Sequence, residues 1–124
     1  MKKLKIKINF KDNRGIISDI LENENINAIT LITIKKGKVR GNHYHKKTYQ
    51  WNYIINGKMK LVTKRNGYKK TIILNKDDVA VTTPYEQHAL VGVTNCKLLV
   101  FTKGPRGGKE YESDTYRLKI PLHK

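Results

Sequence analysis

An all-β barrel is the fold class that this 124-residue sequence predicts. Short β-branched or alternating segments recur along the chain, and each is followed by a turn signal, which is typical of a sandwich or barrel. Only residues 18–25 could form a helical turn, and we do not expect one there. The number of strands and two Asn-Gly turns favour a jelly-roll barrel, whose interior can hold a small ligand.

The expected strands follow one another from the N-terminus. Lysine alternating with apolar residues predicts a strand over 4–10, and a turn at 12–15 leads into an extended segment over 16–21. Asn56-Gly57 and Asn66-Gly67 each predict a tight hairpin turn between the strands beside them. The other expected strands cover residues 29–34, 51–55, 59–63, 71–74, 79–83 and 98–101.

Length and composition predict one domain over residues 1–124, with a flexible Gly-rich stretch at 103–109 before a C-terminal tail. No apolar run is long enough for a membrane span, and the N-terminal segment alternates, unlike a signal peptide. The single cysteine, Cys96, cannot form an internal disulfide. We therefore expect a cytoplasmic protein.

The chain is strongly basic, with a formal net charge of +16 from 26 Lys and Arg against 10 Asp and Glu. Such a charge attracts anions, including nucleic acids and phosphorylated metabolites. The basic residues alternate with apolar ones, as over 3–8, which indicates the solvated face of a sheet. No nucleic-acid-binding motif accompanies them, so nucleic acid is an unlikely partner and an anionic small molecule is the expected one.

Residues 37–57 carry the strongest functional signal. His43 and His45 occupy alternate positions of an expected strand, so both imidazoles face the same side. Two imidazoles on one strand form half of a metal site or an acid–base pair. Gln50 follows in the same segment, and His88 lies in a separate β-patterned region.

These residues resemble the two sequence motifs of the cupin superfamily, which implies a cupin-type jelly-roll β-barrel. The second motif, G-x5-P-x-G-x2-H, is matched loosely at Pro84 and His88, with Asp78 in place of the first glycine and one residue fewer before the histidine. Every interval of the first motif, G-x5-H-x-H-x4-E-x6-G, is matched by Gly37, His43, His45, Gln50 and Gly57.

The cupin resemblance implies a divalent metal ion, which would be zinc, manganese, nickel or iron, and no organic cofactor. Its ligands would be His43, His45, Gln50 and His88. Cupins usually have glutamate where this chain has Gln50. Because an amide oxygen neutralises less of the ion's charge than a carboxylate does, we expect the ion to be held weakly.

Two cupin families are particularly similar to this chain. The run from Arg40 to His45, R-G-N-H-Y-H, resembles the C-terminal cupin domain of capsular-polysaccharide enzymes that epimerise a nucleotide-linked keto-sugar. Residues 12–16 and 114–116 are similar to a D-x-R-G element and a D-T-Y element of the same enzymes. The segment 43–50 also resembles the dTDP-sugar 3,4-ketoisomerases, in which a histidine pair works without metal.

Both resemblances imply proton abstraction next to the carbonyl of a nucleotide-linked keto-sugar, in polysaccharide precursor synthesis. A neutral histidine suits this step, and a metal or hydrogen-bond donors can stabilise the enolate. Without metal the base would be His43 or His45; with metal, Tyr44 would move the proton. Arg40 is expected to bind the substrate's diphosphate, and Asn52 to bind substrate from the cavity face of its strand.

Two other classes of function remain open. One is a metal-dependent cupin with a different small-molecule activity, such as a dioxygenase or a sugar-phosphate isomerase. The other is a non-catalytic cupin that binds a ligand. A fold hosts many reactions, so the resemblance alone does not choose among these classes.

The sequence also predicts a homodimer. Trp51 and Tyr53 alternate with Gln50, so they are expected to point outward if Gln50 points into the barrel. Two large outward aromatic side chains on one sheet are usually covered. The same face of a second subunit is the expected cover.

Overall fold

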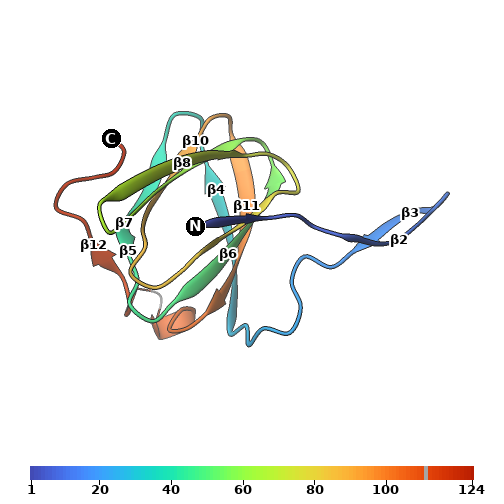
Figure 1. The fold of residues 1–124 in the computed structure, drawn as a ribbon, viewed down its shortest axis with the longest axis horizontal. Helices are drawn as coiled ribbons and strands as arrows, with labels where there is room; N and C mark the ends of the chain where they lie inside the picture. Colours follow the sequence, from blue (N-terminus) through green and yellow to red (C-terminus); the bar gives the residue numbers. More distant parts are fainter. Residues whose placement is uncertain (111) are drawn as a thin grey trace.

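The computed structural model describes residues 1–110 and 112–124, which form a barrel of two antiparallel five-stranded sheets (Figure 1). One sheet contains, in spatial order, β1 (Lys2–Leu4), β9 (Val79–Thr82), β6 (Tyr49–Asn56), β11 (Cys96–Lys103) and β4 (Ala28–Ile34). The other contains β12 (Tyr116–Arg117), β5 (Val39–Tyr44), β10 (Gln87–Gly92), β7 (Met59–Arg65) and β8 (Tyr68–Leu74).

A third, two-stranded sheet projects from the side of the barrel (Figure 1). It consists of β2 (Ile8–Asp12) and β3 (Gly15–Ser18), and we call residues 8–18 the arm. The only helical element in the described part of the chain is the short 3₁₀ turn η1 (Gly108–Glu110). The predicted all-β fold class is therefore confirmed.

The inward-facing side chains change from apolar to polar along the barrel. On β6 they run from Ile54 through Asn52 to Gln50, all buried. On the neighbouring β11, Leu98 pairs with Ile54 and Thr102 with Gln50. The inward-facing side chains of both strands therefore change from apolar to polar at the same height in the barrel. The polar end thus forms a recess above a closed apolar core, which comprises Ile34, Ile54, Met59, Leu61, Leu74, Ala80, Leu90, Cys96, Leu98 and Val100.

The two Asn-Gly turns behave differently. Asn66-Gly67 closes the predicted hairpin between β7 and β8, with φ of 50° and 80°, as a tight two-residue turn requires. The hairpin predicted at Asn56-Gly57 is wrong, because β6 and β7 belong to opposite sheets. Gly57 (φ 84°) lies against the backbone of Asn95, where a Cβ atom would stand 2.2 Å from the carbonyl oxygen. This packing makes the turn a corner between the sheets.

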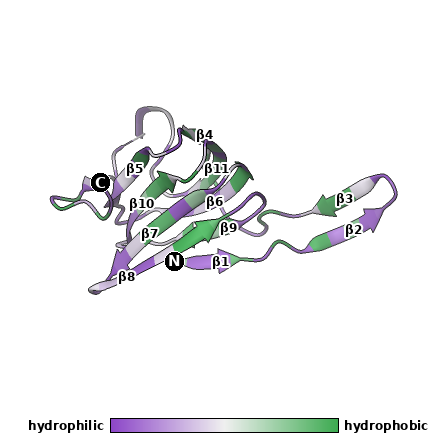
Figure 2. Ribbon diagram, turned by 90° about the horizontal axis from the view of Figure 1, so that it is seen from above, coloured by the Kyte–Doolittle hydropathy of each residue, from purple (hydrophilic) through white to green (hydrophobic). Residues whose placement is uncertain are grey.

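The predicted N-terminal strand over 4–10 divides into two strands with different partners. β1 pairs with β9 at the edge of the barrel, whereas β2 pairs with β3, and within the described residues the arm joins neither barrel sheet. Figure 2 shows hydrophobic segments on this isolated hairpin. Its large apolar side chains are 51–61% exposed, and they are Ile8, Phe10, Ile16 and Ile17.

Trp51 is not exposed to solvent, although the sequence predicts an exposed aromatic face there. Its side chain does point away from the cavity face of β6, but it is only 7% exposed in the single chain. The ring stacks on Tyr49, with centroids 6.3 Å apart. Tyr53 is half-buried and donates a hydrogen bond to Asp77 Oδ1 at 2.8 Å. The argument for a dimer from this face was therefore wrong, because the chain already covers Trp51 itself.

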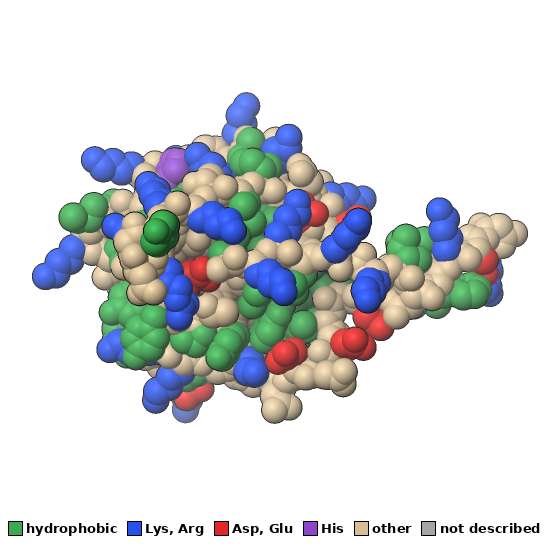
Figure 3. Space-filling view, viewed as in Figure 1, with side chains coloured by type: hydrophobic (Ala, Val, Ile, Leu, Met, Phe, Trp, Pro, Cys, Tyr) green, Lys and Arg blue, Asp and Glu red, His purple; other side chains and the backbone are tan. Residues whose placement is uncertain are grey.

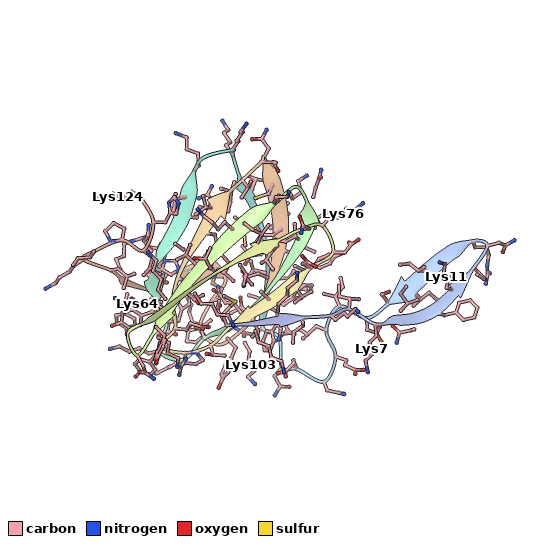
Figure 4. All side chains as sticks on the ribbon, turned by 45° about the horizontal axis from the view of Figure 1, so that its top comes forward. Lys7, Lys11, Lys64, Lys76, Lys103 and Lys124 are labelled. Atoms are coloured by element: carbon pink, nitrogen blue, oxygen red, sulfur yellow. The ribbon has the colours of Figure 1, made fainter. Side chains whose placement is uncertain are left out.

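The basic side chains are scattered, as the alternating pattern predicts. On the face shown in Figure 3 they project singly between apolar and neutral patches. Figure 4 shows Lys11 on the arm, Lys7 just before it, Lys64 and Lys76 on the barrel, and Lys124 at the C-terminal end. Among the described residues, no helix is long and apolar enough to cross a membrane.

From the packing of Gly57 we predict how a substitution there changes the free energy of unfolding, with Gly67 as the matched control. Gly67→Ala also places alanine at positive φ (80°), but nothing lies within 4 Å of the new methyl group. We expect Gly67→Ala to lower the free energy of unfolding by about 1 kcal/mol, from backbone strain alone. Gly57→Ala should cost roughly 2 kcal/mol more, because the methyl group overlaps backbone atoms. Urea unfolding measures both; equal losses would contradict the role of this contact.

Candidate active site in the barrel cavity

Three histidines from different parts of the chain meet at the polar end of the barrel. His43 lies on β5, His88 on β10, and His45 directly follows β5. Their ring centroids are 4.7–5.1 Å apart. One nitrogen of each ring lies within 4.8 Å of the other two. The structure thus brings together the three histidines that the sequence predicts for the site.

A β-bulge in β5 creates this juxtaposition. Gly41 and Asn42 both have positive φ, of 90° and 56°, and the pairing with β10 slips by one residue there, so that His88 stands opposite His43. A Cβ atom on Gly41 would lie 2.9 Å from the carbonyl oxygen of His88. Glycine therefore permits the close approach of the two strands at the level of the histidines.

Asn42 contributes to the bulge in two ways. Asparagine tolerates positive φ better than most residues. Its side-chain oxygen accepts hydrogen bonds from the backbone N–H groups of Leu122 (2.9 Å) and His123 (3.3 Å), and its amide nitrogen donates to the His123 carbonyl. The bulge thus also fixes the C-terminal residues to the barrel.

Hydrogen bonds fix the tautomers of two rings. His45 Nδ1 is 2.8 Å from the carbonyl oxygen of Asp114, and His88 Nδ1 is 3.1 Å from that of Glu86. A carbonyl oxygen can only accept, so both Nδ1 atoms carry the proton and both Nε2 atoms carry a lone pair. His45 Nε2 is buried and has no hydrogen-bond partner among the described residues. Such a nitrogen can take a proton or ligate a metal ion.

The pKa of each of these histidines lies below its ordinary value, chiefly because burial disfavours the charged ring. For His43, burial, the two other imidazoles, Arg117 and Arg106 lower the pKa to about 2. For His88, burial, the neighbouring imidazole and Arg106 lower the pKa to about 4. Burial also lowers the pKa of His45. All three rings are therefore neutral at pH 7.

The histidines border a cavity of about 370 Å³ with a mainly polar lining. His43 and His88 line it directly, and His45 completes the cluster beside them. Gln50 and Asn52 face it from β6 and are 7% and 4% exposed. Arg40 lies at its margin, where its Nε also donates to the Thr33 carbonyl at 3.1 Å.

Sequence reasoning missed two arginines of the cavity. Arg106 and Arg117 both line it, although they come from the segment that follows β11, residues 104–124, which we call the tail from here on. Arg117 arrives through β12, which pairs with β5 and sets this residue opposite His43. No motif marks either position. The sequence shows only that a basic segment follows the last long strand. It does not show which part of the barrel this segment packs against.

Tyr44 is not brought together with the histidines. It occupies the opposite face of β5 and does not line the cavity. Its ring stacks between Tyr116, at 5.3 Å between centroids, and Tyr85, at 6.3 Å. The proton-moving role predicted for Tyr44 has no geometric support in this arrangement.

The donor set of the cluster fits a divalent metal ion. Three imidazole nitrogens converge, and Gln50 lines the same cavity with a side-chain oxygen to offer. The electrostatic setting is less favourable, because the cluster contains no carboxylate and Arg106 adds positive charge near all three rings. The three histidines therefore form a possible metal site.

Solved structures of known enzymes resemble this fold over nearly the whole chain. The sugar 3,4-ketoisomerase QdtA from Thermoanaerobacterium thermosaccharolyticum, in complex with TDP, is 27% identical with a TM-score of 0.79, covering 95% of this chain and 88% of that one. A 3,4-ketoisomerase from Helicobacter canadensis is 26% identical with a TM-score of 0.79, covering 94% and 89%. These matches confirm the predicted cupin-type jelly roll.

The capsular polysaccharide assembling protein CapF from Staphylococcus aureus shares the fold at 17% identity and a TM-score of 0.66, with 94% of this chain matching 35% of that one. No curated protein sequence matches significantly. The family described as the polysaccharide biosynthesis C-terminal domain matches residues 10–116. The chain therefore belongs to the polysaccharide biosynthesis C-terminal domain family.

Proposed function

We propose that this protein is a 3,4-ketoisomerase of dTDP-linked keto-sugars in polysaccharide precursor synthesis. The observation that carries the proposal is the group of three neutral histidines, two of them buried and His43 half-buried, beside a cavity that three arginines border. Two further considerations support it. Four ketoisomerase structures that match over 94–95% of the chain are 26–28% identical, and one of them was solved with TDP-4-keto-6-deoxyglucose.

The reaction moves one proton between neighbouring carbons. A base removes the proton from C3 of the 4-keto sugar, which leaves a 3,4-enediolate. A proton is then delivered to C4, and the hydroxyl proton of O3 passes to O4, so that the carbonyl ends at C3. We assign the first step to His43, because it lines the cavity and is neutral. His45, with its Nε2 lone pair inside the cluster, stands next to it.

The arginines supply the counter-charge for an anionic substrate. Arg40, Arg106 and Arg117 line the cavity together with one carboxylate, Glu112, which pairs with Arg117 at 2.8 Å. Guanidinium groups bind phosphate oxygens in a planar, bidentate manner. Two of them, Arg117 and Arg106, are among the causes that lower the pKa of His43. A bound diphosphate would offset their charge and so remove the part of the lowering of the His43 pKa that the arginines cause.

Exchange in D₂O tests the isomerase directly. With dTDP-4-keto-6-deoxyglucose as substrate, we expect the protein to form the 3-keto isomer and to introduce deuterium at C4, as NMR would show. His43→Asn should lower kcat about 10²- to 10⁴-fold, the range for loss of a general base. His123→Asn, a histidine outside the cluster, is the control and should turn over normally. The absence of any 3-keto isomer, or a fully active His43→Asn, would contradict the mechanism.

A metal-dependent cupin of another activity is the second candidate. It is favoured by the convergence of three histidine nitrogens within 4.8 Å, to which Gln50 would add an oxygen. When bound, a divalent ion would act as a Lewis acid that polarises a carbonyl oxygen. His43, His45 and His88 would then serve as ligands, so none of them would be free to act as the base.

Substitution at Gln50 tests whether this residue is a ligand of a bound ion. Gln50→Glu should raise the affinity for zinc by one to two orders of magnitude, because a carboxylate adds a negative charge at contact distance. Asn52→Asp is the matched control: it adds the same charge to the same face of β6, outside the ligand position, and should change the affinity about tenfold less. Isothermal titration compares the three proteins. Equal zinc affinity in the wild type and Gln50→Glu would show that Gln50 is not a ligand.

We also propose that the protein is a homodimer joined through the arm. An isolated two-stranded hairpin is at best marginally stable in water, yet the arm exposes four large apolar side chains. The edge strand β4 exposes a second apolar surface, with Ile29 at 63% and Leu31 at 58%. A hollow of about 770 Å³ at the base of the arm adds further apolar surface. In a two-fold arrangement, each arm covers the β4 surface of the other copy.

Sedimentation checks this assembly. We expect a dimer at micromolar concentration, and a monomer when Phe10→Asp and Ile17→Asp are combined, because burying two carboxylates in the contact is costly. Tyr68→Ser removes an 83% exposed ring from β8, away from the arm, and should leave the dimer intact. A wild-type monomer, or a dimer that survives both aspartates, would rule out the arm contact.

A further inference from the structure

Asp114 is a buried carboxylate that the proposed reaction does not use. It lies in the tail that follows β11 and is 5% exposed. Its two carboxylate oxygens accept hydrogen bonds from the backbone N–H groups of Lys46 (3.1 Å) and Lys47 (2.8 Å) and from the hydroxyl of Thr48 (2.7 Å). A single side chain thus holds every residue of the turn at 46–48.

The main chain of the same residue holds a ring of the histidine cluster. The carbonyl oxygen of Asp114 accepts the hydrogen bond from His45 Nδ1 at 2.8 Å. The turn at 46–48 begins directly after His45 and ends two residues before Gln50. Asp114 therefore fixes both the orientation of the His45 ring and the turn that joins this ring to the next cavity residue.

The tail also packs closely against this turn at a second residue. Gly104 lies so close to it that a Cβ atom would be 2.9 Å from the Lys47 carbonyl oxygen and 2.9 Å from Thr48 Cα. Between Gly104 and Asp114 the tail passes the cavity with Arg106, and after Asp114 it pairs with β5 and brings Arg117 opposite His43. The contacts at 46–48 thus fasten the segment that delivers both arginines.

The carboxylate of Asp114 is ionised in this position. Burial acts to raise its pKa, but the hydrogen bonds from Thr48, Lys47 and Lys46 outweigh burial, so the pKa lies below its ordinary value. An ionised acceptor forms the stronger, charge-assisted kind of hydrogen bond. These hydrogen bonds from the turn therefore fix the position of Asp114, and with it the carbonyl group that accepts from His45.

We propose that Asp114 is a positioning residue: it fastens the tail to the turn at 46–48 and holds His45 in the Nδ1-protonated tautomer, with Nε2 facing the cluster. Its effect on turnover rests on the proposed isomerase function. The tautomer of His45 does not, and can be measured without substrate. A merely structural anchor would change stability and leave the two ring nitrogens of His45 as they are.

The test compares ring tautomers by two-bond ¹H–¹⁵N NMR. The wild type should show His45 protonated at Nδ1. In Asp114→Asn the side-chain amide lacks the charge and has one acceptor oxygen instead of two, so the His45 signals should move toward the Nε2-protonated form that free histidine favours in water. His88, whose Nδ1 is held by the Glu86 carbonyl, is the internal reference and should not change.

Thr48→Val is the milder variant, since it removes one hydrogen bond of the carboxylate and keeps the shape of the side chain. It should shift His45 partially, and it remains informative if Asp114→Asn does not fold. Ser113→Ala, an exposed neighbour in the tail, is the control and should resemble the wild type. In the isomerase assay kcat should fall about 10- to 100-fold in Asp114→Asn, because a displaced His45 ring disturbs the geometry beside the base His43.

The outcomes separate the two proposals. An unchanged His45 tautomer in both variants overturns the role of Asp114, whatever happens to kcat. Equal changes at His45 and His88 also overturn it, because they indicate general loosening of the barrel. A shifted His45 tautomer in a protein whose wild type does not turn over keto-sugars supports the positioning role and refutes the isomerase instead.

Discussion

The close approach of β5 to β10 is the constraint on which the site depends. The strands meet at Gly41, where any side chain would overlap the His88 carbonyl group, and the bulge at Asn42 sets His43 opposite His88. Without the extra residue, the strand pairing after the bulge would be displaced by one position and its side chains would face the other side. The backbone conformation of the Arg-Gly-Asn run before His43 thus positions the imidazole rings of the site.

Burial then determines the chemistry of these imidazoles. The rings lie above an apolar core, among polar side chains and arginines, and this environment keeps them neutral. Neutral rings are what a proton-abstracting base and a metal ligand both require, which is why the cluster by itself is compatible with either chemistry. The positive charge of Arg106 favours an anionic ligand over a divalent cation.

The tail completes the site. The strands of the barrel supply the three histidines, Gln50 and Asn52, but the tail supplies two of the three cavity arginines and the carbonyl group that orients His45. It reaches these positions through one short strand and the contacts of Asp114. In the proposed reaction, binding of the anionic substrate and orientation of His45 therefore depend on the same segment.

The sequence by itself determined what is local. Alternation placed His43 and His45 on one face, spacing related them to Gln50, and Asn66-Gly67 set a hairpin, because side-chain direction and turn geometry follow from the immediate neighbours. The distant His88 was found only because a family motif includes it. No local rule decides which strands lie opposite one another.

Only the tertiary structure decided what is not local. It made Asn56-Gly57 a corner between sheets, since the packing of Gly57 on Asn95 depends on a strand that follows much later. It covered Trp51. It also returned Arg106 and Arg117 to the histidines, because the pairing of a two-residue strand rests on contacts across the barrel that neither its own sequence nor its neighbours encode.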